Sequence, residues 1–208
     1  MIKTVKALAI IITFALTFIS CSPKPSEVVK KYESAFNSHD VNKLTSLFTD
    51  NAVIELSLLN HLKGKNQIRG YAEYDSVLSS QITISDIAEN DGRAYFVMTL
   101  KNDLLRTLGI DEEKYSLIFK IDGGKIENIS GGVTNRTEIE LKTFQNAFML
   151  WAARKRLDVL NEIMPNGNLV YNATNAKKYL ALVTEWKRDN NPSFVKSPTE
   201  KKTTPNNQ

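Results

Sequence analysis

Few residues in this chain have the types and spacing that carry well-known chemistry. Its 208 residues include two histidines, His39 and His61, and one cysteine, Cys21. There is no H-x-x-x-H pair and no pair of cysteines, so we expect no metal site and no intrachain disulfide. The pairs Gly123-Gly124 and Gly131-Gly132 are typical of turns and bulges, not of a phosphate-binding loop. We therefore expect no cofactor, and any reaction must depend on acid–base groups that the fold brings together.

The net charge of the chain argues against a nucleic-acid partner. The formal charge of the chain is +4, and Lys3 and Lys6 account for two of these charges, so +4 − 2 leaves +2 beyond the first 20 residues. This charge is too small to indicate nucleic-acid binding, and no stripe of basic and aromatic residues supports it. We expect no nucleic-acid partner.

The first 21 residues resemble the leader of a bacterial lipoprotein. Lys3 and Lys6 precede an apolar run over residues 7–19, which is short for a membrane span. Residues 18–21, with the sequence FISC, then resemble a lipobox, although leucine is more usual at the first of these positions. The resemblance implies cleavage before Cys21 and lipid on its sulfur and its new amino group. An ordinary secretory signal and an uncleaved anchor are the alternatives.

The residues around this cysteine indicate where the protein would reside. Ser22 is not acidic, and no acidic segment follows Cys21. We therefore expect a signal peptide at 1–20, a tether at 21–25, and a lipid anchor in the bacterial outer membrane, with the protein facing the periplasm.

The pattern of residues 26–133 predicts an α+β domain. A helix is expected from Ser26 to Phe36, and Asp40 can cap a second, short helix. Alternating apolar and polar residues predict strands, and turn sequences at 90–92 and 122–124 predict hairpins in a curved antiparallel sheet. The remaining expected elements are a strand over 52–56, a helix over 65–78, and strands over 82–88, 93–102, 114–121 and 125–133.

Two more helices are predicted after the sheet. The segment Thr137 to Glu140 fits a capping box, and an apolar face continues from Leu141 to Ile163. A second helix is expected over about 172–186. We expect a C-terminal helical hairpin over 136–189 that packs on the domain, and a disordered tail over 190–208.

This order of elements, together with two segments, resembles the nuclear transport factor 2-like superfamily and its SnoaL-like branch. The segments are FNSHDVNKLTSLFTDNAVIEL at 36–56 and KGKNQIRGY at 63–71. The resemblance spans residues 26–133 and implies a domain over 26–135. It also implies a cone-shaped fold, in which a bent sheet wraps around helices and leaves a pocket between them.

The resemblance also suggests pocket residues. Alignment with the ketosteroid isomerases of this superfamily puts Tyr32 at their oxyanion-binding tyrosine, Leu56 at their aspartate base and Leu117 near their second acid. Leucine cannot take a proton, so that acid–base pair is missing here. We expect a pocket lined by Tyr32, Leu56, Tyr71 and Leu117, with His61 near its mouth.

Two functions from different classes fit these residues. The first is a noncatalytic module that binds an apolar small molecule, or pairs with a second copy through the outer face of the sheet. The second is a SnoaL-like enzyme of the isomerase, cyclase or dehydratase type, whose base is His61, Asp75 or Asp103. Two titratable groups converging beside Tyr32 would favour the enzyme, whereas an apolar or filled pocket would favour the binding module. Tyr32 can also be simply a core aromatic residue.

The lipid anchor gives a direct test of the leader. Labelling cells with an alkyne fatty acid should mark the wild-type protein and should not mark Cys21→Ser, because that substitution removes the sulfur that receives the lipid. Equal labelling of both proteins would contradict the lipidation.

Overall fold

The computed structural model of this protein describes residues 23–57, 61–133 and 135–190. Cys21 and the predicted leader lie outside these residues, as does the tail after Asn190. Within the described part of the chain, no helix has the length and apolar composition that crossing a membrane requires. The elements in chain order are α2 (Pro25–Asn37), α3 (Val41–Ser46), β1 (Phe48–Leu56), β2 (Leu62–Lys63), α4 (Lys65–Val77), β3 (Gln81–Asn90), β4 (Arg93–Lys101), α5 (Asp103–Leu108), β5 (Glu113–Asp122), β6 (Lys125–Val133), α6 (Asn135–Lys155), α7 (Leu157–Ile163), the short 3-10 helix η1 (Pro165–Gly167) and α8 (Ala173–Asn190).

The N-terminal helices form where the sequence predicts them. Helix α2 buries the face that carries Tyr32 and Phe36. Helix α3 begins after Asp40, whose Oδ1 accepts a 2.9 Å hydrogen bond from the backbone N–H of Lys43. Such a bond satisfies one of the N–H groups that every helix start leaves free. The predicted cap is therefore confirmed.

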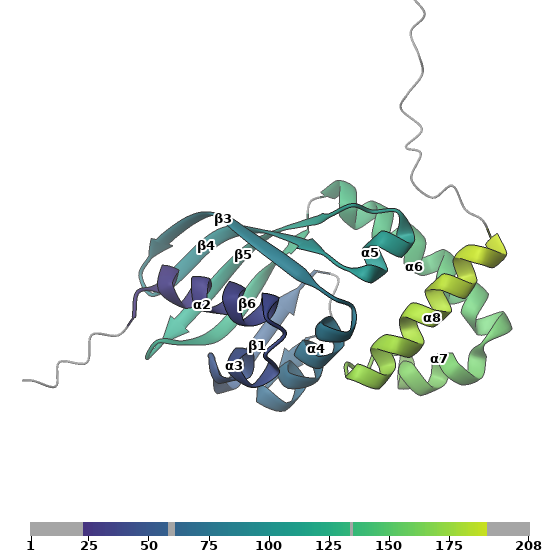
Figure 1. The fold of residues 1–208 in the computed structure, drawn as a ribbon, viewed down its shortest axis with the longest axis horizontal. Helices are drawn as coiled ribbons and strands as arrows, with labels where there is room; N and C mark the ends of the chain where they lie inside the picture. Colours follow the sequence, from purple (N-terminus) through teal and green to yellow (C-terminus); the bar gives the residue numbers. More distant parts are fainter. Residues whose placement is uncertain (1–22, 58–60, 134, 191–208) are drawn as a thin grey trace, which may run out of the picture.

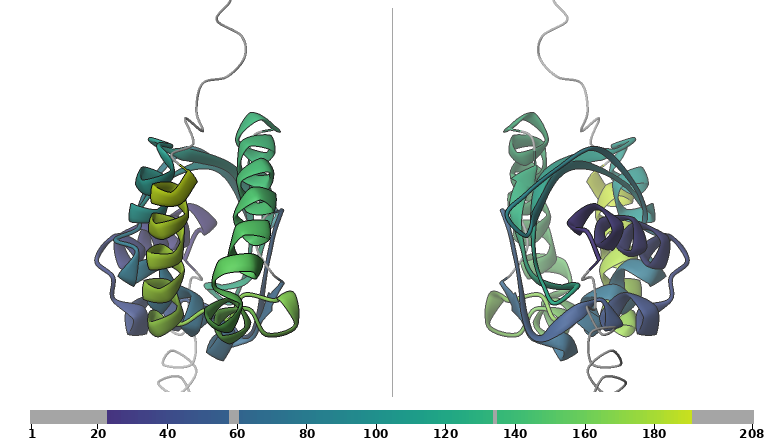
Figure 2. Two further views of the ribbon diagram at one scale, coloured as in Figure 1. Left: turned by 90° about the vertical axis from the view of Figure 1, so that its right-hand side faces the viewer. Right: turned by 90° about the vertical axis from the view of Figure 1, so that its left-hand side faces the viewer.

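A six-stranded sheet in the order β2-β1-β6-β5-β4-β3 curves around α2 (Figures 1 and 2). The predicted hairpins β3–β4 and β5–β6 are present, and Asp91 and Gly92 occupy the left-handed φ region at the first turn. The sheet is antiparallel except that β1 and β6 run parallel, which the sequence did not predict. No hairpin turn joins β1 to β6, so no local turn signal fixes their relative direction.

Aromatic rings pack the space between α2 and the sheet. The centre of the Tyr32 ring lies 5.1 Å from the ring centre of Phe119 and 6.2 Å from that of Phe48, and both pairs meet edge to face. Phe119 lies 4.8 Å from Phe96 in the same geometry. Edge-to-face contacts at these distances are favourable because the positive ring edge meets the negative face of its neighbour. Tyr32 is therefore part of the core of the sheet domain.

The C-terminal helices form a second core together with α5. In Figure 1 they lie at one end of the sheet, beside α5. Leu108 of α5 belongs to the same buried cluster as the apolar side chains of α6, α7 and α8. The cluster is completed by Phe144, Phe148, Trp151, Ala152, Leu160, Ile163, Leu182, Val183 and Trp186. The C-terminal helices thus bury their apolar faces against the sheet domain, as well as against one another.

The first of these helices differs from the prediction at both ends. Helix α6 begins at Asn135, ahead of the expected start at Thr137. A single helix through Ile163 was predicted, but Arg156 interrupts it with a φ of −145° and a ψ of 41°. The break leaves Leu157 53% exposed, while Ile163 is fully buried.

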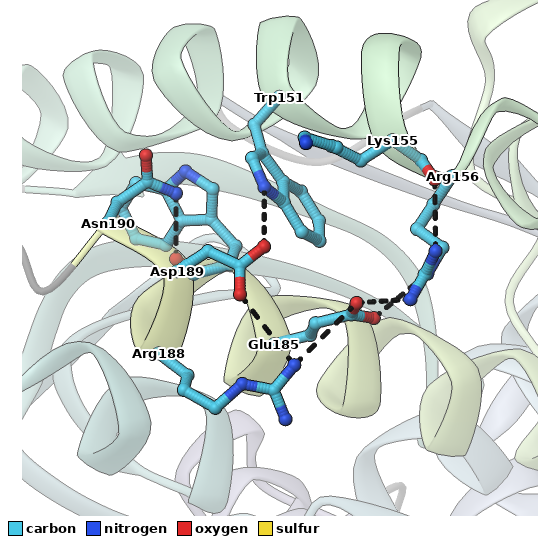
Figure 3. Close-up of polar contacts among 8 residues, drawn as sticks. Trp151, Lys155, Arg156, Glu185, Arg188, Asp189 and Asn190 are labelled. Carbon is cyan, nitrogen blue, oxygen red and sulfur yellow. Dashed lines mark hydrogen bonds and ion pairs between the residues drawn. The ribbon is translucent and has the colours of Figure 1, made fainter.

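Polar contacts connect this break to α8 (Figure 3). The guanidinium of Arg156 donates to both carboxylate oxygens of Glu185, in the two-pronged geometry that suits this pair. Trp151 Nε1 donates a 3.3 Å hydrogen bond to Asp189 Oδ2. Arg188 Nη2 lies 3.8 Å from Glu185 Oε1 and 3.6 Å from Asp189 Oδ1. At the break, Arg156 therefore reaches α8 and pairs with Glu185.

A glycine allows the segment before α8 to approach α4. A β-carbon at Gly70 would lie 2.4 Å from the carbonyl oxygen of Tyr171, which is closer than real contacts allow. The Tyr171 ring then meets Tyr71 and Tyr74 of α4 edge to face, at 5.3 and 5.2 Å. Glycine in a helix costs about 1 kcal/mol relative to alanine. At this position the cost is offset by close packing of the C-terminal segment on the domain.

Candidate functional site

A cavity of about 230 Å³ lies where the C-terminal helices meet the sheet domain. Tyr71, Tyr74 and Asp75 of α4 form one part of its wall, and Glu113 and Tyr115 of β5 form another. The rest of the wall comes from the end of β4, from α5, from α6, from the segment 164–171 and from α8, including Leu78, Leu100, Asn102, Leu104, Leu105, Leu108, Leu141, Phe144, Gln145, Met149, Met164, Gly167, Leu169, Tyr171 and Tyr179. The wall is mostly aromatic and aliphatic, with a few polar groups, which is the usual composition of a small-molecule site.

Asp75 is one of two buried carboxyl groups in this wall. Its side chain is on the same side of α4 as Tyr71, one helical turn away, and only 5% of the residue is exposed. Oδ1 accepts a 2.9 Å hydrogen bond from the Ser80 hydroxyl, whereas Oδ2 has no partner of hydrogen-bond geometry among the described residues. Burial raises the pKa of Asp75 to about 6, although the hydroxyls of Ser80 and Tyr71 act to lower it. Burial dominates because a charged carboxylate loses more hydration than a neutral acid.

Glu113 is the second buried carboxyl group, and 3% of the residue is exposed. Its Oε2 accepts a 2.8 Å hydrogen bond from the Tyr115 hydroxyl, while Oε1 has no hydrogen-bond partner in the described part of the chain. Burial raises the pKa of Glu113 to about 7; the Tyr115 hydroxyl lowers it, and the negative charge of Asp75 raises it further. Both carboxyls line the same cavity, and the charge of Asp75 acts on the ionisation of Glu113.

The cavity presents acid–base groups and no fixed positive charge. None of the described residues that line it is a lysine, an arginine or a histidine. Burial raises the pKa of Tyr71 and Tyr115 well above the ordinary value, so both phenols stay protonated near neutral pH. Near neutrality the pair can hold one carboxylate and one partly protonated acid, which is the combination that proton-transfer chemistry uses. Among the described residues, no group of three His, Cys, Asp or Glu is placed to hold a metal ion.

The structure does not bring the five predicted pocket residues together. Tyr71 lines the cavity, whereas Tyr32 and Leu117 are buried in the core and Leu56 packs against that core. His61 is exposed, and its Nδ1 lies 3.3 Å from Glu55 Oε1, beside a separate surface depression. The cavity lies beyond the predicted position because aromatic rings fill the space next to Tyr32.

The three residues suggested as a catalytic base lie in different places in the structure. Asp75 lies in the cavity wall together with Tyr71. Burial raises the pKa of Tyr32 and of Tyr71, and the negative charge of Asp75 raises both further. Asp103 is not among the described residues that line the cavity, and it pairs with Arg106 on α5. His61 is on the surface, as described above. Two titratable groups, Asp75 and Glu113, do line one cavity, but Tyr32 is not among the residues that line it with them.

Glu113 was missed, although the sequence held a signal for it. In β5, residues 113, 115, 117 and 119 share one face by strand alternation, and Leu117 and Phe119 are core residues. A carboxyl group on this face must point inward. Asp75 carried the equivalent signal on a helix, because it lies four residues after Tyr71 on the apolar side.

We predict that stability falls as pH rises through the range where these carboxyls titrate. Their pKa values of about 6 and about 7 lie above the ordinary values, so the folded state holds more protons at pH 5–6 than the unfolded state does. The free energy of unfolding should therefore decrease between pH 5 and pH 8, by roughly 1.5 kcal/mol through Asp75 and roughly 2.5 kcal/mol through Glu113. Urea denaturation at about pH 5 and about pH 8 measures this decrease.

The double variant Asp75→Asn/Glu113→Gln is the comparison. It should show a much smaller decrease over the same range, because neither amide titrates. Lysine partners lower the pKa of Asp50 and Glu112, so these two carboxyls titrate at lower pH. All other side chains are the same in both proteins, so their contributions cancel in the comparison. An identical pH dependence of wild type and variant would refute the assignment of these buried carboxyls.

Comparisons with known proteins bear on the family. Residues 29–129 match the family model of the SnoaL-like domain. No curated protein matches the chain. Similar solved structures include an NTF2-like protein of unknown function from Cytophaga hutchinsonii ATCC 33406, with 10% sequence identity, a TM-score of 0.48, and coverage of 58% of this chain and 99% of that chain.

Two other similar structures have names that mention an activity. The epoxide hydrolase/cyclase-like enzyme SalBIII, which takes part in pyran ring formation in salinomycin, has 18% identity and a TM-score of 0.48, covering 54% of this chain and 92% of that chain. A provisionally assigned ketosteroid isomerase from Kribbella flavida DSM 17836 has 12% identity and a TM-score of 0.45, covering 52% and 76%. These identities are too low to indicate a shared activity. The family model and the observed α+β architecture together show that residues 29–129 of this chain form a SnoaL-like domain.

Proposed function

We propose that this protein binds a small, largely apolar molecule in the cavity between its SnoaL-like domain and its C-terminal helices. The observation that carries the proposal is a cavity of about 230 Å³ whose apolar wall contains two buried carboxyls, each with one oxygen that lacks a partner. A buried polar atom without a hydrogen bond costs about 1–3 kcal/mol of stability. Such atoms are rare in native proteins, and a bound ligand that donates hydrogen bonds would satisfy them.

The walls supply the rest of the binding energy. Leu105 and Leu108 of α5 face the cavity from one side, and Phe144 and Met149 of α6 face it from another. Apolar area that a ligand removes from water contributes roughly 25 cal/mol per Å². The ligand we propose therefore has an apolar body held by these side chains and a polar end directed at Asp75 and Glu113.

We also propose that a lipid on Cys21 tethers this binding domain to the bacterial cell envelope. The support is the leader sequence, with Lys3, Lys6, an apolar run and the FISC segment at 18–21. Each buried CH₂ of an acyl chain contributes about 0.8 kcal/mol to membrane attachment. The outer membrane, facing the periplasm, is the proposed location. A homodimer through the outer face of the sheet remains a prediction.

Filling the cavity tests the binding function. A suitable probe is 2-phenylethanol, which has about nine non-hydrogen atoms; an engineered cavity of roughly 150 Å³ holds benzene, so this probe fits a somewhat larger space. Met149→Trp should weaken its binding by about tenfold or more, because the indole occupies space that the probe needs. Isothermal titration calorimetry measures the affinity.

The neighbouring residue provides the control. Leu150, the next residue of α6, is not among the residues that line the cavity and is 62% exposed. Leu150→Trp adds the same side chain outside the cavity and should leave the affinity unchanged. If wild type does not bind the probe, or if both variants weaken binding equally, this cavity is not the binding site.

An acid–base enzyme of the isomerase, cyclase or dehydratase type is the second candidate. The observation that favours it is the pair of carboxyls with pKa values of about 6 and about 7, which can supply a base and an acid at the same pH. A small β,γ-unsaturated ketone, 3-cyclohexenone, tests it by the absorbance of its conjugated product. For an enzyme we expect turnover well above the solution rate and a large loss of kcat in Asp75→Asn. Turnover that is no faster than in solution would contradict the enzyme and leave binding as the one proposed function.

A further inference from the structure

Among the described residues that line the cavity, two carry carboxyl groups and none carries a positive charge. We propose that its ligand is a small amine that binds as a cation, with its nitrogen paired to the carboxylates of Asp75 and Glu113. This inference rests on the proposed binding function of the same cavity, and it names the chemical class of the ligand.

Charge balance is the first step of the argument. Glu112, the residue before Glu113, has two basic partners: its carboxylate lies 3.6 Å from Lys101 Nζ and 3.2 Å from Lys114 Nζ. Asp75 and Glu113 lack any such partner among the described residues that line the cavity. Buried carboxylates without a counter-charge are unfavourable, so they either take up a proton or bind a cation. A cationic ligand supplies the missing charge at a pH where the carboxyls would otherwise remain partly protonated.

Hydrogen-bond donors are the second step. The groups that face the carboxyls are neutral hydroxyls: Ser80 and Tyr71 at Asp75, and Tyr115 at Glu113. Asp75 Oδ2 and Glu113 Oε1 still lack partners, and both residues are at least 95% buried. An alcohol has one O–H donor, whereas a primary ammonium has three N–H donors. An ammonium group bound between the two carboxyls would have enough donors for both oxygens, and charge-assisted bonds of this kind are stronger than neutral ones.

The aromatic wall is the third step. Tyr71 and Tyr74 of α4 line the cavity, as do Tyr115 of β5 and Tyr179 of α8. Burial raises the pKa of all four phenols, so the rings are neutral and keep the negative faces that attract cations. Ring faces within about 6 Å of a positive charge stabilise it. The same rings would bind the apolar body of an aromatic amine by edge-to-face contact.

Three probes of one size separate charge from shape. They are 2-phenylethylamine, which is a cation, 2-phenylethanol, which is neutral, and phenylacetate, which is an anion. At about pH 8 both carboxyls are mainly ionised, and the amine should bind about tenfold or more tightly than the alcohol, with no detectable binding of phenylacetate. Isothermal titration calorimetry of the full chain measures all three.

The effect of pH has a definite sign. Protonation of Asp75 and Glu113 removes the charges that hold the amine, so its affinity should decrease as pH falls from about 8 to about 5. The affinity of the alcohol should change much less. Near pH 6–7 a bound cation lowers the pKa of both carboxyls, so binding should release protons. Calorimetry in two buffers of different ionisation enthalpy detects this release without any variant.

Two variants and one control complete the test. Asp75→Asn and Glu113→Gln should each abolish most of the preference for the amine while retaining 2-phenylethanol binding, which also shows that the variant is folded. Glu112→Gln removes the same charge one residue away, outside the cavity, and should bind the amine as the wild type does. If a cavity variant also fails to bind the alcohol, the pH dependence and proton release of the wild type decide the question.

The outcomes separate the two proposals. Equal binding of amine and alcohol at about pH 8, with no proton release, would overturn the inference about the amine and leave the binding function standing. Absence of binding by every probe would overturn both. Tight phenylacetate binding would also overturn the inference, because an anion cannot pair with two carboxylates.

Discussion

The N-terminal helices bury apolar side chains at one end of the curved sheet but not at the other, and much of the structure follows from this constraint. Helices α2 and α3 pack within the curve, where Tyr32, Phe48 and Phe119 fill the space. At the other end, Leu108 of α5 and Leu78 after α4 need cover, and the C-terminal helices supply it. The close approach at Gly70 shows how tightly one part of this contact is packed. The cavity lies in the same contact, where side chains from distant segments meet without filling the space.

Burial of Asp75 and Glu113 works against stability. Several charged side chains form ion pairs at the surface, such as Lys65 with Asp50 and Lys120 with Glu127, and such pairs change stability little. Two carboxyls in an apolar wall with free oxygens are unfavourable for the empty protein, in the way that binding sites often are. The contrast between Glu112, which has two lysine partners, and Glu113, which has none, is local and independent of the family.

The sequence predicted the elements better than the site, for physical reasons. Helix α2, the cap at Asp40 and the hairpin at Asp91-Gly92 depend on neighbouring residues, and all three were predicted correctly. The parallel pairing of β1 with β6 and the break at Arg156 depend on contacts between distant segments, and both were missed. The pocket was predicted from an alignment that places Tyr32 at the oxyanion-binding tyrosine of ketosteroid isomerases. In this structure the space around Tyr32 is packed, and of the five predicted residues Tyr71 alone lines the cavity. Asp75 was named as a possible base, but its pairing with Glu113 across the fold could not be read from local patterns.

The carboxyl groups of the cavity and much of its apolar wall come from different parts of the chain. Both carboxyls belong to the SnoaL-like domain, on α4 and β5, whereas Phe144, Met149 and Tyr179 come from helices outside the stretch that matches the family. Under the proposed function, substitutions on α6 or α8 would alter which molecules fit while both carboxyls stay in place. In evolutionary terms, a helical segment of this kind would let one domain take different ligands without any change in the groups proposed to recognise them.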